Sequence, residues 1–173
     1  MFKDERLDVM YAYSVLINEE LFVFKDGTVR AFKYSKFTDK EMFAKTTLGI
    51  LPHRDALYNF SVCKLASNEK IVLTGGFTNR KPSGKVFALE TQTGKWQTQP
   101  LPDLNVARAG HASLSIEHHV YVACGMGDGD KLLRTIEVLS LVGDGAGPLS
   151  WDLIDLTELT PRMYPVFSQV AHN

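Results

Sequence analysis

The chain has 173 residues and a mass of 19.3 kDa, which fits one ordinary domain spanning residues 1–173. Hydrophobic residues make up 45% of it, and 19 basic residues against 20 acidic ones leave a net charge of −1. This balance argues against a general nucleic-acid binder, which needs a basic excess, and against a disordered chain. No apolar run approaches the roughly 18 residues of a membrane helix. The charged start MFKDERLDVM lacks an apolar signal-peptide core, so we expect a cytoplasmic protein.

Short apolar stretches recur along the chain at a nearly constant interval and predict β-strands. The first set consists of Leu21–Phe24, Ile71–Thr74 and Val120–Ala123, expected as equivalent inner strands. Each stretch follows a polar corner and ends at a turn that contains glycine. A second set follows at Val29–Tyr34, Val86–Thr91 and Ile136–Leu141. After a large aromatic residue and a segment with proline and arginine, a third set opens the next unit, at Tyr58–Leu65, His111–Ile116 and Tyr164–Val170.

Each unit of about 50 residues therefore predicts four short antiparallel strands, which is the pattern of a β-propeller blade. The units cover residues 11–57, 58–106 and 107–161, and a partial unit covers 162–173. Three blades and one strand are too few for a closed ring, because propellers hold about four to eight blades. We predict an all-β, incomplete propeller whose bare edges favour self-association, or which is part of a longer chain or complex.

Two segments also fit a helix. Thr38 and Glu41 match a capping box before Met42, and a helical stripe is formed by Leu132, Leu133, Ile136 and Leu139. The repeat alignment overrides both helical interpretations, because the matching segment Lys85–Thr91 is β-rich and too short for a helix.

The ordered motifs resemble the kelch repeat, in which a strand ending in Gly-Gly precedes another strand, a Trp and a Pro/Arg loop. The second unit matches best, with IVLTGG at 71–76, KVFALE at 85–90, Trp96 and LPDLNVARAGH at 101–111. The third has VYVACG at 120–125, TIEVLSL at 135–141 and Trp151, with Cys124 in place of the first glycine. The first unit departs most, since Lys25-Asp26 replaces Gly-Gly and Phe43 replaces Trp. The resemblance spans about residues 11–173 and implies kelch-type blades, with Trp96 and Trp151 buried between units.

No residue set predicts catalysis, a cofactor or a metal site. His118 and His119 are adjacent in a predicted turn, and neighbouring residues of a strand point to opposite faces. Cys63 and Cys124 lack the paired spacing of a zinc site. The segment 127–130 (GDGD) lacks the acidic ladder and terminal Glu of a calcium loop, and 143–147 (GDGAG) lacks the Lys-Ser/Thr of a phosphate-binding loop.

One propeller face is the better candidate for a site. Because successive strands run antiparallel, the turns between second and third strands and the blade-to-blade loops share a face. Arginine and tyrosine, which are enriched in binding hot spots, gather there together with one histidine. The candidate partner-binding residues are Arg54, Tyr58, Arg80, Arg108, His111, Arg134, Arg162 and Tyr164. Arg54, Arg108 and Arg162 recur with the repeat, so a scaffold role competes with binding; Arg80 and Arg134 are specific to one unit.

The kelch resemblance implies a protein–protein interaction module that binds through these loops, as a substrate-recruiting or assembly scaffold. An acidic segment is the expected ligand, because arginine pairs well with carboxylates. Two alternatives remain open. The chain is a structural subunit of a large complex, or it is a fragment of a kelch-like enzyme whose active residues lie in other blades.

Overall fold

The computed structural model describes residues 13–17, 20–25, 28–33, 45–50, 57–65, 70–97, 101–141, 148–158, 160–163 and 165. These residues form antiparallel β-sheets and a single 3-10 turn, η1 (Asp128–Asp130). The first sheet contains β1 (Tyr13–Ile17), β2 (Glu20–Lys25), β3 (Thr28–Lys33) and β4 (Lys45–Ile50). The second contains β5 (Ser61–Lys64), β6 (Lys70–Thr74) and β9 (Val86–Glu90). The third contains β10 (Ala112–Ile116), β11 (His119–Ala123), β12 (Thr135–Ser140) and β13 (Trp151–Asp155).

Each sheet is an up-and-down meander, because its strands follow one another in space in chain order. The three apolar stretches predicted as equivalent lie in β2, β6 and β11, and each holds the second place in its sheet. The second sheet has three strands, with an isolated bridge from Leu89 to Trp96 where the fourth would lie. The small hairpin of β7 (Phe77–Thr78) and β8 (Lys81–Pro82) extends from the β6–β9 connection.

The competing helix over 132–139 does not form. β12 is a strand from Thr135 to Ser140 that pairs antiparallel with β11. The segment is therefore a strand, as the repeat predicts. The capping-box segment at Thr38 and the expected strand Tyr164–Val170, apart from Pro165, lie outside the described residues. No helix in the described ranges is long and apolar enough to cross a membrane.

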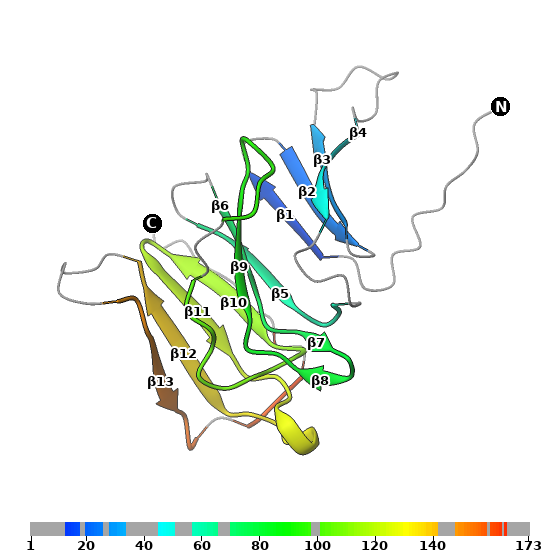
Figure 1. Ribbon diagram of the computed structural model, residues 1–173. Coiled ribbons are helices and arrows are strands. Elements are labelled where there is room, and N and C mark those ends of the chain that lie inside the picture. The colour runs from blue at the N-terminus through cyan, green and yellow to red at the C-terminus, as the bar shows by residue number, and fades with distance from the viewer. Residues whose placement is uncertain are drawn as a thin grey trace.

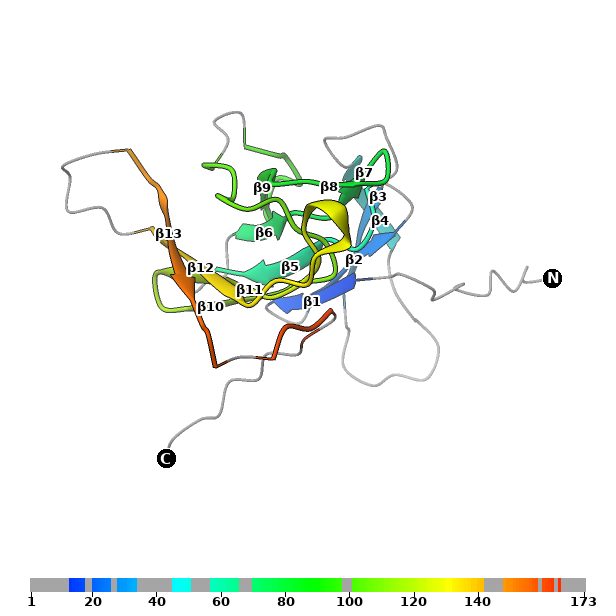
Figure 2. The same cartoon turned by 90° about the horizontal axis from the view of Figure 1, so that it is seen from below.

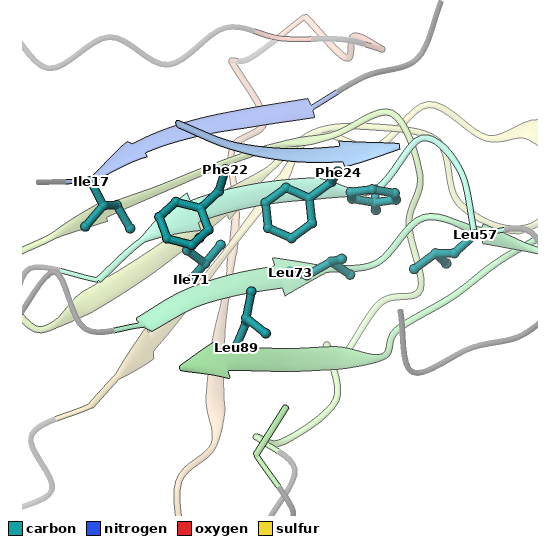
Figure 3. Packing of buried hydrophobic residues seen from close by; sticks show 8 residues of the cluster. Ile17, Phe22, Phe24, Leu57, Ile71, Leu73 and Leu89 are labelled. Carbon is teal, nitrogen blue, oxygen red and sulfur yellow. The ribbon is translucent and has the colours of Figure 1, made fainter. Parts of the chain in front are cut away.

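The second strand of the middle sheet, β6, lies between two hydrophobic layers and is the centre of the core. Ile71 and Leu73 point toward the first sheet, where they pack with Phe22 and Phe24 (Figure 3). Val72 points the other way, into the cluster formed with the third sheet. A strand buried on both faces needs an unbroken apolar run, and the sequence IVL supplies one.

The layer between the second and third sheets is closed by a tryptophan. Trp151 of β13 is 5% exposed and packs with Leu139, Val120 and Val86. Its Nε1 donates a hydrogen bond of 2.8 Å to the Pro102 carbonyl oxygen. Trp151 is therefore buried between units, as predicted.

Trp96, the matching residue of the second unit, is only partly buried. It packs against the edge of the first core cluster and meets Phe87 edge-to-face at 6.2 Å. Its bridge to Leu89 holds it beside β9 without a full outer strand. The prediction that both tryptophans are buried between units is thus met fully by Trp151 and in part by Trp96.

The first strands of the sheets lie nearest the common axis. β5 contacts both β1 and β10, so the sheets fan out around these strands (Figure 1). Ser113 of β10 donates from its amide and its hydroxyl to Ser61 Oγ, at 2.9 and 2.8 Å. Within the described residues the array is an open arc of propeller-like sheets, not a closed ring.

The same backbone hydrogen bonds recur in the second and third units. Gly75 N–H donates to the Lys85 carbonyl at 2.9 Å, and Cys124 N–H donates to that of Thr135 at 3.1 Å. The following residue reaches the next inter-blade loop in both units. Gly76 N–H donates to the Arg108 carbonyl at 2.9 Å, and Gly125 N–H donates to that of Arg162 at 2.8 Å. The repeat in the sequence therefore corresponds to a repeat of these backbone hydrogen bonds.

These turns explain the glycines. Gly75 has φ +56°, and a Cβ there would lie 2.5 Å from the Arg108 carbonyl oxygen. Cys124 takes the corresponding left-handed conformation, φ +60°, with a side chain present. It does so in a buried position, where the surrounding packing must hold an unfavourable backbone.

Candidate interaction surface

Two connections project from the same end of the sheets. The first joins β6 to β9 and carries the β7–β8 hairpin; the second joins β11 to β12 and carries η1. Figure 1 shows both below the sheets, and Figure 2 looks onto them from below. We call the surface formed by residues 57–59, 75–85, 124–134 and 160–163 the loop face. The turns at 91–95 and 117–118 lie at the opposite end (Figure 1).

The tips of the two connections each contain two successive residues with positive φ. Asn79 and Arg80 have φ values of +51° and +62°, and Gly129 and Asp130 have +65° and +58°. In the β7–β8 hairpin these two residues form the tight turn preferred in hairpins, between the paired residues Thr78 and Lys81. In the other connection they belong to the 3-10 turn η1. Arg80 and Asp130 are both exposed there, so the loop face presents opposite charges at its two tips.

Positive charge concentrates on the β7–β8 hairpin. Arg80 and Lys81 are both exposed, and neither forms an ion pair with another described residue. The η1 connection is balanced instead, since Asp128 and Asp130 accompany basic side chains further along it. Arg134, one of these, donates a long hydrogen bond of 3.5 Å to the Thr157 carbonyl oxygen. An anionic group is therefore attracted most strongly to the hairpin.

An aromatic ring lies at the foot of this hairpin. Tyr58 and Phe77 form a backbone bridge, and their rings stack at a tilt with centroids 5.2 Å apart. Tyr58 keeps 37% of its surface exposed. The backbone bridge and the stack hold Tyr58 in place, so a contact with its exposed surface would cost little conformational entropy.

The recurrent Arg108, proposed from sequence for the loop face, points into the protein. Its guanidinium is fully buried and donates to the carbonyl oxygens of Cys124 at 3.0 Å and Thr135 at 3.2 Å. It also donates to Thr135 Oγ1 at 3.0 Å and to Glu137 Oε1 at 2.6 Å. Burial lowers the pKa of Arg108 below that of a free arginine, and the Glu137 carboxylate opposes this shift. Such a side chain has no surface to offer a partner and belongs to the scaffold.

Glu137, which sequence reasoning did not single out, completes this network. It is fully buried, and besides Arg108 it accepts hydrogen bonds from the backbone N–H groups of Asn105 at 2.6 Å and Val106 at 3.1 Å. The side-chain amide of Asn105 donates through Nδ2 to the Trp151 carbonyl oxygen at 2.7 Å. The blade-to-blade loop is thereby fixed to the sheet that follows it. The sequence signal for this role was the charge of Glu137 between the apolar residues Ile136 and Val138 of β12.

His111 is also an interior residue. Its Nε2 lies 2.9 Å from Thr74 Oγ1, and its ring is packed against Gly75. Nδ1 has no hydrogen-bond partner among the described residues. Burial, together with the positive charge of Arg108, lowers the pKa of His111 to about 3, so the ring is neutral near neutral pH. His111 also lies beside Gly125 in the same way that Phe60 lies beside Gly76. Phe60 is therefore the residue of the preceding unit that matches His111, and it is buried.

The remaining candidates divide by position. Arg162 is exposed on the loop face, and only its backbone carbonyl is used, by Gly125. Arg54 and Tyr164 lie outside the described residues. Of the proposed site residues, the structure therefore brings Tyr58, Arg80, Arg134 and Arg162 to the loop face.

Comparison with known proteins supports the fold alone. No protein-family model matches the chain, and no curated protein matches it in sequence. Among solved structures the chain is similar to one described as the structure of YjhT, with a TM-score of 0.60 and 14% sequence identity. The match covers 82% of this chain and 45% of that one, so this chain spans about half the length of that neighbour.

Proposed function

We propose that this chain is a non-catalytic, kelch-type protein-interaction module of the cytoplasm whose loop face binds an acidic segment of a partner protein. The observation that carries the proposal is the β7–β8 hairpin. It presents Arg80 and Lys81, exposed and without an ion pair to any described residue, beside the half-exposed ring of Tyr58. Arginine and tyrosine on a fixed support are typical of binding hot spots.

The charge pattern limits how the partner sits. Carboxylates gain from the hairpin, where Arg80 offers paired donors. They are repelled by Asp128 and Asp130 on the neighbouring connection, which are exposed. An acidic segment should therefore lie over the second unit, with a neutral or basic part reaching the third.

The alternatives from the sequence stay as rivals. A structural subunit would use its sheet faces and edges in place of the loops. An enzyme fragment would need reactive groups supplied from blades other than these; the described residues contain no group of three metal-ligating side chains.

The test is a calorimetric titration with an oligo-glutamate peptide, using an oligo-lysine peptide as the reversed-charge control. Replacing Arg80 and Lys81 with alanine should weaken binding about tenfold, which is about 1.4 kcal/mol. Replacing Asp128 and Asp130 with asparagine should strengthen it, because two repulsive charges are removed. Lys95→Ala, a basic residue at the opposite end, should change nothing.

The position of the effective substitutions separates the proposal from non-specific attraction between the peptide and the protein. If Arg80→Ala/Lys81→Ala and Lys95→Ala weaken binding equally, the loop face has no special role. If Arg134→Ala alone abolishes binding, the site lies on the third unit.

A further inference from the structure

Alternate residues of the strands pack against different neighbouring sheets, and the pattern is the same in the second and third sheets. In the second sheet, Ile71 and Leu73 face the first sheet, and the alternate residue Val72 faces the third. In the third sheet, Val120 and Val122 occupy the places of Ile71 and Leu73 and face the second sheet. Each sheet therefore buries one face against its predecessor and offers the other to a successor.

The successor face of the third sheet has no described sheet against it, yet it is apolar. Its residues alternate with those that face the second sheet and lie opposite one another in the strand register. They are Leu114, Tyr121, Ile136 and Val138. All four are partly exposed. The matching residues of the second sheet are all buried, and all but Ala88 belong to the cluster shared with the third sheet: Cys63, Val72, Val86 and Ala88.

The predecessor face of the first sheet is open in the same way. Phe22 and Phe24 point toward the second sheet. The alternate residues Leu21 and Val23 are partly exposed, and Leu16, paired with Leu21 across the strands, is 59% exposed. Within the described residues, one end of the arc thus has a successor face, and the other a predecessor face, against which no sheet is packed.

We propose that these two open faces join two copies of this chain head to tail, so that two arcs of three sheets close one ring. The third sheet of each copy packs on the first sheet of the other. The contact would continue the kind of packing already made twice within the chain. Different patches meet, and such contacts close into a ring when the rotation between copies allows it.

The size of the product supports a second copy as the occupant. Two arcs give about six sheets, within the four to eight of known propellers. The similarity to the YjhT structure covers 45% of that chain, so two copies approach the length of that molecule. The apolar side chains are leucine and valine on the first sheet and leucine, isoleucine, valine and tyrosine on the third, so apolar surface is available on both faces. The faces also carry Ser14, paired with Val23, and Asp152, paired with Val138.

The experiment measures mass by light scattering and native mass spectrometry at micromolar concentration. The 173-residue chain should have about twice the monomer mass of 19.3 kDa. Leu16→Asp on the first sheet and Val138→Asp on the third should each give folded monomers. Leu132→Asp, an equally apolar but loop-face substitution at a 42% exposed residue, should leave the dimer intact.

Mixing the two monomeric variants gives the sharper result. Head-to-tail packing predicts that they recombine into a heterodimer, because one of its two joints contains only wild-type faces. Contacts between like faces cannot be rescued in this way, so failure to recombine overturns the head-to-tail arrangement. A wild-type monomer overturns the proposal altogether and leaves the open faces to other chain segments or other proteins. Should Val138→Asp fail to fold by circular dichroism, Tyr121→Lys replaces it.

Discussion

At the scale of single residues, Arg108 shows how a buried charge is made tolerable. Every one of its guanidinium nitrogens has an acceptor, and the Glu137 carboxylate neutralises it at 2.6 Å. Removing one member of such a pair leaves the other charged and buried, which costs far more than an exposed pair contributes. Arg108 and Glu137 therefore depend on each other, and together they fix the path of the loop between blades.

His111 gives a prediction about pH. In the unfolded chain its pKa is the ordinary 6.5, whereas in the folded chain it is about 3. Between pH 6.5 and 3, His111 is therefore protonated in the unfolded chain and neutral in the folded chain. The free energy of unfolding should fall as the pH drops from 6.5 toward 3, by up to about 1.4 kcal/mol per pH unit from this group.

The measurement is urea unfolding across this pH range for the wild type and for His111→Phe. Phenylalanine is chosen because Phe60 holds the matching place. The variant should have a visibly shallower pH slope, while His118→Gln, at an exposed residue, should follow the wild type. Identical slopes for wild type and His111→Phe would mean that His111 is not buried neutral.

At the scale of elements, the outer part of each blade is where the units differ. The third unit has a complete fourth strand, β13, whose Trp151 is fastened to the loop at Pro102. The second has a bridge at Trp96 and no full strand. The same aromatic position is therefore buried to different extents in the two neighbouring units.

Replacing each tryptophan with alanine should expose that difference. Trp151→Ala should cost about 3–5 kcal/mol of the free energy of unfolding, as large aromatic deletions in cores do. Trp96→Ala should cost clearly less, because its ring is only partly buried. Trp151→Phe isolates the hydrogen bond to Pro102 and should cost about 1 kcal/mol beyond the change in packing. Equal losses for the two alanine variants, measured by urea unfolding, would contradict this order.

At the scale of the whole molecule, the strands and their order could be predicted, because the apolar runs recur at a constant interval. These runs are the second strands of their sheets, and not the innermost strands that the sequence predicted, because β1, β5 and β10 lie nearest the axis.

A scaffold role for Arg108 was one of the two interpretations that its recurrence allowed, but burial does not follow from recurrence, because Arg162 also recurs and is exposed. The partner of Arg108 could not be predicted, because Glu137 matches Phe87 in the second unit, so this network has no counterpart in the repeat. The charge contrast between Arg80 and Asp130 also needed the structure, since the structure places both residues, exposed, at the tips of connections on the loop face.

The most direct test of the loop face as the binding surface is hydrogen–deuterium exchange, read by mass spectrometry with and without the oligo-glutamate peptide. The peptide should slow exchange in 77–83, around the β7–β8 hairpin, and at the neighbouring residues 57–59. Exchange at 91–95 and 117–118, at the opposite end, should be unchanged. Protection at that opposite end, or binding that protects no part of the hairpin, would contradict the proposal.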